Sequence, residues 1–458
     1  MIHSVKKLLL LLLYLLKSLN YAGAQENKDA SSLKELLTLA ESNYPLLKSK
    51  AFDLQAAQKS VDASKSTLIP SLDASYQLDF ATYNNITGMA YPQFLIPISG
   101  PPSSRNNMNG VFGSAASLVL NWQPLTFGQR QSQVDLAIAG LQYATADAKN
   151  EIFKHKVNVI SAYLDVLLTT ELVRLYEENV KRSEASSSQI RTLVLSGIKP
   201  GVDSSLLKAE VSKAKIDLFN SKKSKAQALV ILAQLLATDT IPQLNDTSYF
   251  SQLPVYYDLT DTARNPLLSL YTGSIGVSKA RKKVITKTKM PTLGLWGSTY
   301  TRGSGVSYNG TVKSTDGLGF QRYNYGLGLQ LSVPILQFAR VRPQLQQQDL
   351  IIKSNQEKLN EIALQLKSQN ELADTAFYNA LAIVKETPLF YESATFSYKA
   401  MLSRYQSGLA NFADLIQAQY ILIKAETDNR VAYMSVWKSL LFKAAVSGNL
   451  NLFLNQVN

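Results

Sequence analysis

Four short stretches of the chain alternate between apolar and polar residues. In the clearest, from Tyr323 to Val333, every odd position is apolar or aromatic and every even position is polar or glycine. The stretch from Leu72 to Phe80 follows the same rule, and weaker versions begin near Phe112 and Leu293. A period of two predicts a β-strand with one apolar face. We therefore expect strands at about 71–83, 111–124, 291–302 and 321–334.

The length of these stretches is informative. Each has about 9–11 residues, the number that a tilted strand needs to cross the hydrocarbon core of a membrane. Aromatic residues gather at their ends, where an interfacial girdle would lie. A water-soluble sheet with one buried face would show the same alternation, so the strands alone leave both interpretations open. The long helices described next favour the interpretation that the strands cross a membrane.

Two very long polar helices are predicted. The first runs from about Gln129 to Ser196 without proline, which corresponds to roughly 100 Å at 1.5 Å per residue. The second runs from about Pro343 to Ser407, and we expect a kink or a break at Pro388. Its apolar and small residues recur in alternating steps of three and four, which predicts a narrow heptad seam. The predicted seam positions are Leu359, Ile362, Leu366, Gln369, Ala373, Ala376, Ala380 and Ile383.

The two halves of the chain repeat one plan of helix, strand, glycine-rich loop, strand and helical hairpin. Three residues at the hairpin tips recur 211 positions later: Ser196, Gly197 and Asp203 correspond to Ser407, Gly408 and Asp414. A repeat of this length sets the architecture. We expect a first repeat at 25–236 with its hairpin at 128–236, a linker at 237–262, and a second repeat at 263–458 with its hairpin at 338–447.

The start of the chain has the features of a secretory signal peptide. Lys6 and Lys7 precede the apolar run from Leu8 to Leu16, and Ala22-Gly23-Ala24 offers a cleavage site. The run is too short for a membrane-spanning helix, and Lys17 argues against an N-terminal anchor. We therefore expect residues 1–24 to be removed and the mature chain to contain no transmembrane helix.

Composition narrows the class of protein. The chain has no cysteine, which excludes a disulfide framework. An exported chain of this kind suits the envelope of a Gram-negative bacterium. The net charge is +13, but Lys and Arg are scattered along the helices among Glu, Asp and Gln. This distribution and the secretory signal argue against nucleic acid as a partner.

Catalytic chemistry is poorly supported. The chain has two histidines, His3 and His155, and His3 leaves with the signal peptide. A catalytic triad would then depend on His155 in the middle of a polar helix, and a histidine metal cluster is excluded. No glycine-rich phosphate motif lies between a strand and a helix. We therefore predict a protein that is not an enzyme and that needs no cofactor or metal.

Four strands cannot close a barrel alone, because their outer edges would be unpaired in lipid. Bacterial barrels begin at about eight strands, so several copies must contribute to one barrel. Three copies would supply twelve strands. We therefore predict an α+β membrane protein with four strands per chain in a 12-stranded trimeric β-barrel, a long α-helical barrel and two internal repeats.

At this point the residues resemble the TolC-like outer-membrane efflux proteins, from about Ser31 to Leu454. The motifs that carry the resemblance are the approach to the first strand at 63–72, the exit from the second at 124–130, and the turn at 404–419 with its first-repeat counterpart at 197–210. The resemblance implies a homotrimer in the outer membrane of a Gram-negative bacterium, extending into the periplasm. It implies a passive exit duct of a tripartite efflux or type I secretion system. A periplasmic adaptor, or membrane fusion protein, and an inner-membrane pump of RND or ABC type would be its partners.

The resemblance also assigns roles at the tips. Asp414 matches an acidic residue that rings the periplasmic gate, and Gln417 stands where a second acid would be, which implies a weaker acidic ring. Asp203 and Tyr405 match a hydrogen-bonded latch that holds the tips closed. We expect the adaptor to dock at Ser196, Gly197, Ser407 and Gly408. The alternatives are that both aspartates cap helices and that the glycines only form turns.

A second function stays open at this stage. The long helices would also suit an envelope coiled-coil scaffold or an adhesin stalk without transport activity. That alternative predicts a water-soluble mature chain whose strands do not face lipid.

Overall fold

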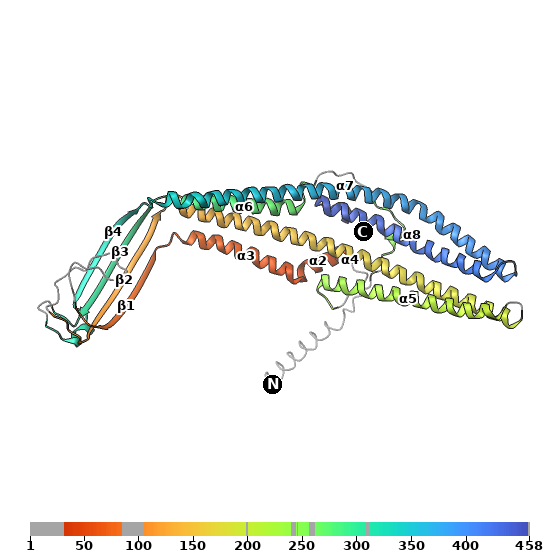
Figure 1. Ribbon diagram of the computed structural model, residues 1–458, viewed down its shortest axis with the longest axis horizontal. Helices are drawn as coiled ribbons and strands as arrows, with labels where there is room; N and C mark the ends of the chain where they lie inside the picture. Colours follow the sequence, from red (N-terminus) through yellow and green to blue (C-terminus); the bar gives the residue numbers. More distant parts are fainter. Residues whose placement is uncertain are drawn as a thin grey trace, which may run out of the picture. The chain divides into compact units, whose positions relative to one another are not determined.

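The computed structural model describes residues 32–84, 105–197, 200–239, 244, 246–255, 262–307 and 311–456. The predicted signal peptide and part of the predicted linker lie outside these residues. Long helices and four strands make up the described chain (Figure 1). In chain order the elements are α2 (Leu33–Asn43), α3 (Pro45–Ser66), β1 (Ser71–Ala81), β2 (Val111–Leu125), α4 (Gln129–Leu195), α5 (Gly201–Leu236), η1 (Ser248–Phe250), α6 (Pro266–Lys287), β3 (Thr292–Ser304), η2 (Ser314–Leu318), β4 (Arg322–Ser332), α7 (Gln337–Gln406), α8 (Phe412–Ser447) and α9 (Asn451–Leu454).

The chain divides into two compact units. The first, here called the helical unit, comprises residues 1–53, 144–272 and 357–458. The second, here called the sheet unit, comprises residues 54–143 and 273–356. Each unit combines segments from both halves of the sequence. The division of the sequence into two repeats around a linker stays a prediction.

The sheet unit holds one antiparallel sheet in the order β1-β2-β3-β4. Each strand begins and ends within two residues of the bounds that the alternation predicts. The register aligns Leu72 with Leu120, Leu120 with Gly297, and Gly297 with Leu327. Together with the long helices, this sheet confirms the predicted α+β fold.

The register collects the alternating residues of all four strands on two chemically different faces. The apolar face is open, since Leu327 is 75% exposed and Tyr325 is 92% exposed. A soluble sheet would cover such a face with a core. The apolar face includes Leu72, Ala74, Tyr76, Leu78, Phe80, Phe112, Leu118, Leu120, Leu295, Tyr323, Tyr325, Leu327, Leu329 and Leu331. The opposite, polar face includes Asp73, Ser75, Gln77, Asp79, Trp296, Arg302, Arg322, Asn324 and Gln330.

The exit from β2 into α4 is fixed by side chains of the motif at 124–130. The Thr126 hydroxyl accepts a hydrogen bond from the Arg130 amide at 3.2 Å, which satisfies a donor in the first turn of α4. The Arg130 guanidinium donates to the carbonyls of Gln123 and Pro124. The motif therefore ends a strand and starts a helix with its own polar groups.

The helical unit packs around two apolar clusters. The larger joins α2, α4, α5, α7, α8 and α9 around Leu164, Leu232 and Phe377, which have no exposed surface. The smaller lies nearer the hairpin tips and includes Ile190, Leu207, Tyr405 and Leu415. No helix in the described part of the chain has an apolar stretch long enough to cross a membrane.

The predicted heptad seam on α7 has the right spacing, but three of its eight positions, Gln369, Ala376 and Ile383, are exposed. Leu366, Ala373 and Ala380 are buried as expected. At the other positions the buried residue is the next one along the chain: Asn370, Phe377 and Val384 are buried. The predicted Ile383 is instead 57% exposed. Phe377 offers far more apolar area than the neighbouring Ala376, so its burial decides the phase of the helix.

Of the kink or break predicted at Pro388, the break does not occur, since α7 is continuous from Gln337 to Gln406. A proline inside a helix leaves the carbonyl four residues earlier without its amide donor. That carbonyl belongs to Val384, and the Thr387 hydroxyl lies 3.3 Å from it as a substitute donor. The side chain before the proline thus places a donor within reach of the carbonyl that the proline leaves without its amide.

Candidate functional site at the hairpin tips

Both hairpins of the helical unit turn at a glycine in the left-handed conformation, Gly197 with φ 75° and Gly408 with φ 79°. After α7, the Leu409 amide donates to the Arg404 carbonyl and the Gly408 amide donates to the Tyr405 carbonyl, at 2.8 and 3.1 Å. These two bonds form a Schellman motif, which requires a residue that tolerates positive φ. Gly408 therefore has a structural reason to be glycine.

Asp203 and Tyr405, 202 positions apart, meet in the interior of the helical unit. The Tyr405 hydroxyl donates a hydrogen bond to Asp203 Oδ2 at 2.7 Å. Tyr405 is 1% exposed and Asp203 is 8% exposed. Burial and the bond to Asp203 both raise the pKa of Tyr405 above its usual value. The pair joins the first turn of α5 to the last turn of α7. Its role as a latch stays a prediction.

Asp414 and Gln417 have a different environment, since both side chains are exposed on the first turns of α8. Neither Asp203 nor Asp414 is the N-cap residue of its helix. The N-cap of α8 is Asn411, whose side chain accepts from the Asp414 amide at 2.9 Å, and the N-cap of α5 is Pro200. The carboxylate of Asp414 is therefore available to solvent and ions, and its gating role stays a prediction.

The four expected docking residues are all exposed in the described structure: Ser196, Gly197, Ser407 and Gly408. Their backbone forms the two turns, and all four residues are accessible to solvent. Docking of an adaptor at these positions stays a prediction.

A second tyrosine–carboxylate pair lies near the first and is not predicted from the sequence. The Tyr420 hydroxyl of α8 donates to Glu210 Oε1 of α5 at 2.5 Å. Burial first, and then this bond, raise the pKa of Tyr420 to about 12. Beside it, the buried Gln419 amide donates to the Ser183 hydroxyl at 2.8 Å. Adjacent residues of α8 thus bind α5 and α4.

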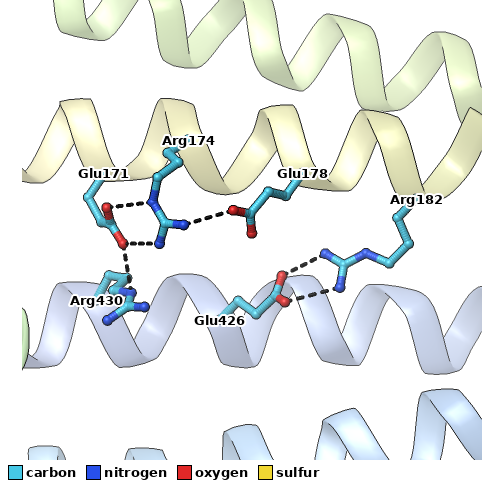
Figure 2. A network of polar contacts seen from close by, with 6 residues as sticks. All are labelled: Glu171, Arg174, Glu178, Arg182, Glu426 and Arg430. Atoms are coloured by element: carbon cyan, nitrogen blue, oxygen red, sulfur yellow. Dashed lines mark hydrogen bonds and ion pairs between the residues drawn. The ribbon is translucent and has the colours of Figure 1, made fainter.

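Farther along α8, a network of six charged residues joins it to α4 (Figure 2). Arg182 binds Glu426 through two parallel hydrogen bonds of 3.0 and 2.8 Å. Such bidentate pairs are stronger and more directional than single contacts. In the second part of the network, Glu171 accepts from Arg174 of its own helix and pairs with Arg430 of α8 at 3.1 Å.

Only the contact between Asp203 and Tyr405 at this site is predicted from the sequence. The spacing of Glu171, Arg174 and Glu178 on one helix is recognisable as a set of neighbouring charges. The pairs between helices depend on how α8 is aligned with α4 and α5, and no local pattern in the sequence records that alignment.

His155, on which a catalytic triad was predicted to depend, is packed in the helical unit. Its ring stacks on Tyr44 with 4.0 Å between centroids, and the residue is 5% exposed. Burial lowers the pKa of His155. Over the described residues, no group of three His, Cys, Asp or Glu side chains is arranged to hold a metal ion.

Comparison with known proteins identifies the fold. Residues 36–238 match the outer membrane efflux protein family. No curated protein sequence matches the chain. The chain is similar to the solved structure of CusC with a TM-score of 0.76 at 12% identity, covering 92% of each chain. The outer-membrane channel OprN gives a TM-score of 0.73 at 15% identity, covering 91% of this chain and 90% of OprN.

A third similar structure is the CmeC outer-membrane channel of Campylobacter jejuni, with a TM-score of 0.73 at 14% identity. The match covers 92% of this chain and 87% of CmeC. At such identities the similarity establishes the fold, and the family match over 36–238 supports it independently. The predicted resemblance is confirmed: this chain has the fold of the TolC-like outer-membrane efflux proteins, and its first half matches their family.

Proposed function

We propose that three copies of this chain form an outer-membrane channel that serves as the passive exit duct of a tripartite efflux or type I secretion system. The observation that carries the proposal is the sheet of four strands with one open apolar face, one polar face and two outer strands. In lipid, such outer strands must be paired. Pairing between copies would close a barrel with lipid on its apolar side and water on its polar side.

The helical unit supplies the periplasmic part of the proposal. Its hairpins end in exposed glycine turns that would meet a periplasmic adaptor, which in turn contacts an inner-membrane pump. The buried bond between Tyr405 and Asp203 would hold the tips closed. Three copies would also gather the exposed Asp414 carboxylates around one axis, where their like charges favour cations.

The first experiment tests membrane location and assembly. The mature chain should fractionate with the outer membrane of a Gram-negative bacterium, require detergent for extraction, and run as a trimer in native mass spectrometry. A stable monomer in plain buffer would contradict the proposal and favour the coiled-coil scaffold or stalk.

The second experiment tests the gate. The purified trimer in a planar bilayer should show a low conductance that rises when Asp203 or Tyr405 is replaced by Ala. Asp414→Asn should reduce the preference for cations, whereas the neighbouring Gln417→Asn should leave it unchanged. Equal behaviour of the two α8 variants would contradict the role of Asp414.

A further inference from the structure

We propose that β4 of one copy pairs with β1 of the next in a single register, in which Ser332 lies opposite Ser71 of the partner subunit and Arg322 lies opposite Ala81 of the partner subunit. This inference rests on the proposed trimeric channel and specifies its subunit seam. Both strands contain 11 residues, so this register pairs them along their whole length. The alternating strand directions of the sheet make the new pair antiparallel.

The two faces of the sheet limit the possible registers. On β1 the polar side chains have odd numbers, and on β4 they have even numbers. A slip of one residue would turn apolar side chains of β4 toward the polar side of β1. The possible registers therefore differ by steps of two residues.

The stagger of the sheet supports the full-length register. A path across the hydrogen-bonded partners runs from Leu72 to Leu120, Gly297 and Leu327. In the proposed register Leu327 meets Tyr76 of the partner subunit, so the path returns four residues farther along β1. That is a displacement of about 13 Å over about 19 Å of sheet width, or a tilt of about 35°. Closed barrels have tilts of about 35–45°, whereas a path returning to Leu72 would give an untilted barrel.

Charges on the polar face are complementary across the same seam. Arg302 and Arg322 are directly opposite each other on β3 and β4, an unfavourable arrangement for like charges. No ion pair within the described part of one chain involves either arginine or the two aspartates of β1, Asp73 and Asp79. The proposed register places Asp79 of the partner subunit opposite Asn324 and diagonally next to Arg322.

Trp296 distinguishes this register from its two neighbours. Its ring covers Gly326 and Gly328 of β4, where an added Cβ would approach the ring to 3.1 and 2.7 Å. The proposed register brings Gln77 and Ser75 of the partner subunit beside these glycines. A shift of two residues in either direction would place Asp73 or Asp79 of the partner subunit there, next to the aromatic ring.

Disulfide trapping in the full-length trimer tests the register, and the absence of native cysteine removes any background. Ala74→Cys is combined with Leu329→Cys in the predicted pair, and with Leu327→Cys or Leu331→Cys in matched controls on the same exposed face. Directly opposite residues have Cβ atoms about 4.5–5.5 Å apart, whereas diagonal neighbours are at about 7–8 Å, beyond disulfide reach. Within one chain, β1 and β4 are about 14 Å apart, so any cross-link joins copies.

The expected result is a covalent trimer on a non-reducing gel for Ala74→Cys with Leu329→Cys, and little product for the two controls. A cross-link formed best with Leu327→Cys or Leu331→Cys would overturn the register while leaving the trimeric channel intact. A protein that stays monomeric would overturn the proposed function as well.

A charge variant gives a second readout that needs no cross-link. Asp79→Asn should lower the temperature at which the trimer dissociates in SDS, because Arg322 loses its nearest anion. Asp73→Asn should lower it less, because Asp73 lies opposite Gln330 of the partner subunit. A larger effect of Asp73→Asn would contradict the proposed register.

Discussion

The two hairpin tips occupy equivalent places in the sequence but use their aspartates in opposite ways. Asp203 is buried and accepts a hydrogen bond from Tyr405, whereas Asp414, 211 positions later, is exposed. The difference begins at the preceding cap. Asn411 caps α8 with its side chain, while Pro200 has no side chain that could cap α5. The two tips therefore share a backbone turn without sharing the chemistry of their side chains.

The same comparison extends along α8. The start of α5 is held through Asp203, whereas α8 is held through its own cap and through the bidentate pair between Arg182 and Glu426. Variants that each remove one of these contacts should therefore destabilise the two tips to different extents.

The largest effect is expected for Glu426→Ala. It leaves Arg182, whose side chain is 22% exposed, without its carboxylate. The cost should be about 2–3 kcal/mol, below the ~3–5 kcal/mol of a fully buried pair because some solvent reaches both groups. Hydrogen exchange of α8 amides should accelerate about 30-fold or more. Glu178→Ala, at the exposed end of the network, is the control, and an equal acceleration there would contradict the prediction.

Tyr405→Phe should come next and should act on the first tip. It leaves the buried carboxylate of Asp203 without a donor, at a cost of about 1–3 kcal/mol. Faster exchange in the first turn of α5 is the expected observation. Asp414→Asn, which alters the equivalent aspartate of the other tip, should leave the exchange at both tips close to that of the parent protein.

Substitutions of the N-cap residues should affect the start of α8 more than the start of α5. Asn411→Ala removes the side chain that accepts from the Asp414 amide, which should cost about 1 kcal/mol at the start of α8. Pro200→Ala should change the start of α5 little, because Pro200 makes no side-chain cap. Thermal unfolding and local exchange would measure both variants, and equal losses would remove the distinction between the tips.

The smallest effect concerns alkaline pH. The pKa of Tyr420 is raised to about 12 by burial and by its bond to Glu210, above the value of about 10 in an unfolded chain. The folded state therefore holds its proton more tightly, and the resulting stability is present below about pH 10 and lost between about pH 10 and 12. Tyr420→Phe should flatten this part of the stability profile, and an unchanged profile would contradict the assignment.

Sequence patterns predicted the strands well because alternation reports directly on which side chains share a face. Tyr323 to Val333 is an example, since its odd positions form the apolar face of β4. The pairing of Asp203 with Tyr405 followed from the resemblance to a family, and the structure brings these two side chains together.

Other features were beyond reach because they depend on tertiary alignment. The phase of the α7 seam was decided by Phe377, whose burial requires partners from other helices. The bonds from Tyr420 to Glu210 and from Arg182 to Glu426 join residues more than 200 positions apart. A single sequence records their charges and hydroxyls but not which of them face one another.

The turn of α7 that contains Pro388 also contacts a side chain of α8. The Thr387 hydroxyl has one proton and two acceptors within reach, the Val384 carbonyl at 3.3 Å and Asn429 Oδ1 at 3.0 Å. If the proton serves Val384, Asn429 must present its NH2 group to the Thr387 oxygen, because only the amide nitrogen can donate. Thr387 would then act as a relay that carries a hydrogen bond from one helix into the backbone of another, and Thr387→Val would sever both links in a single step.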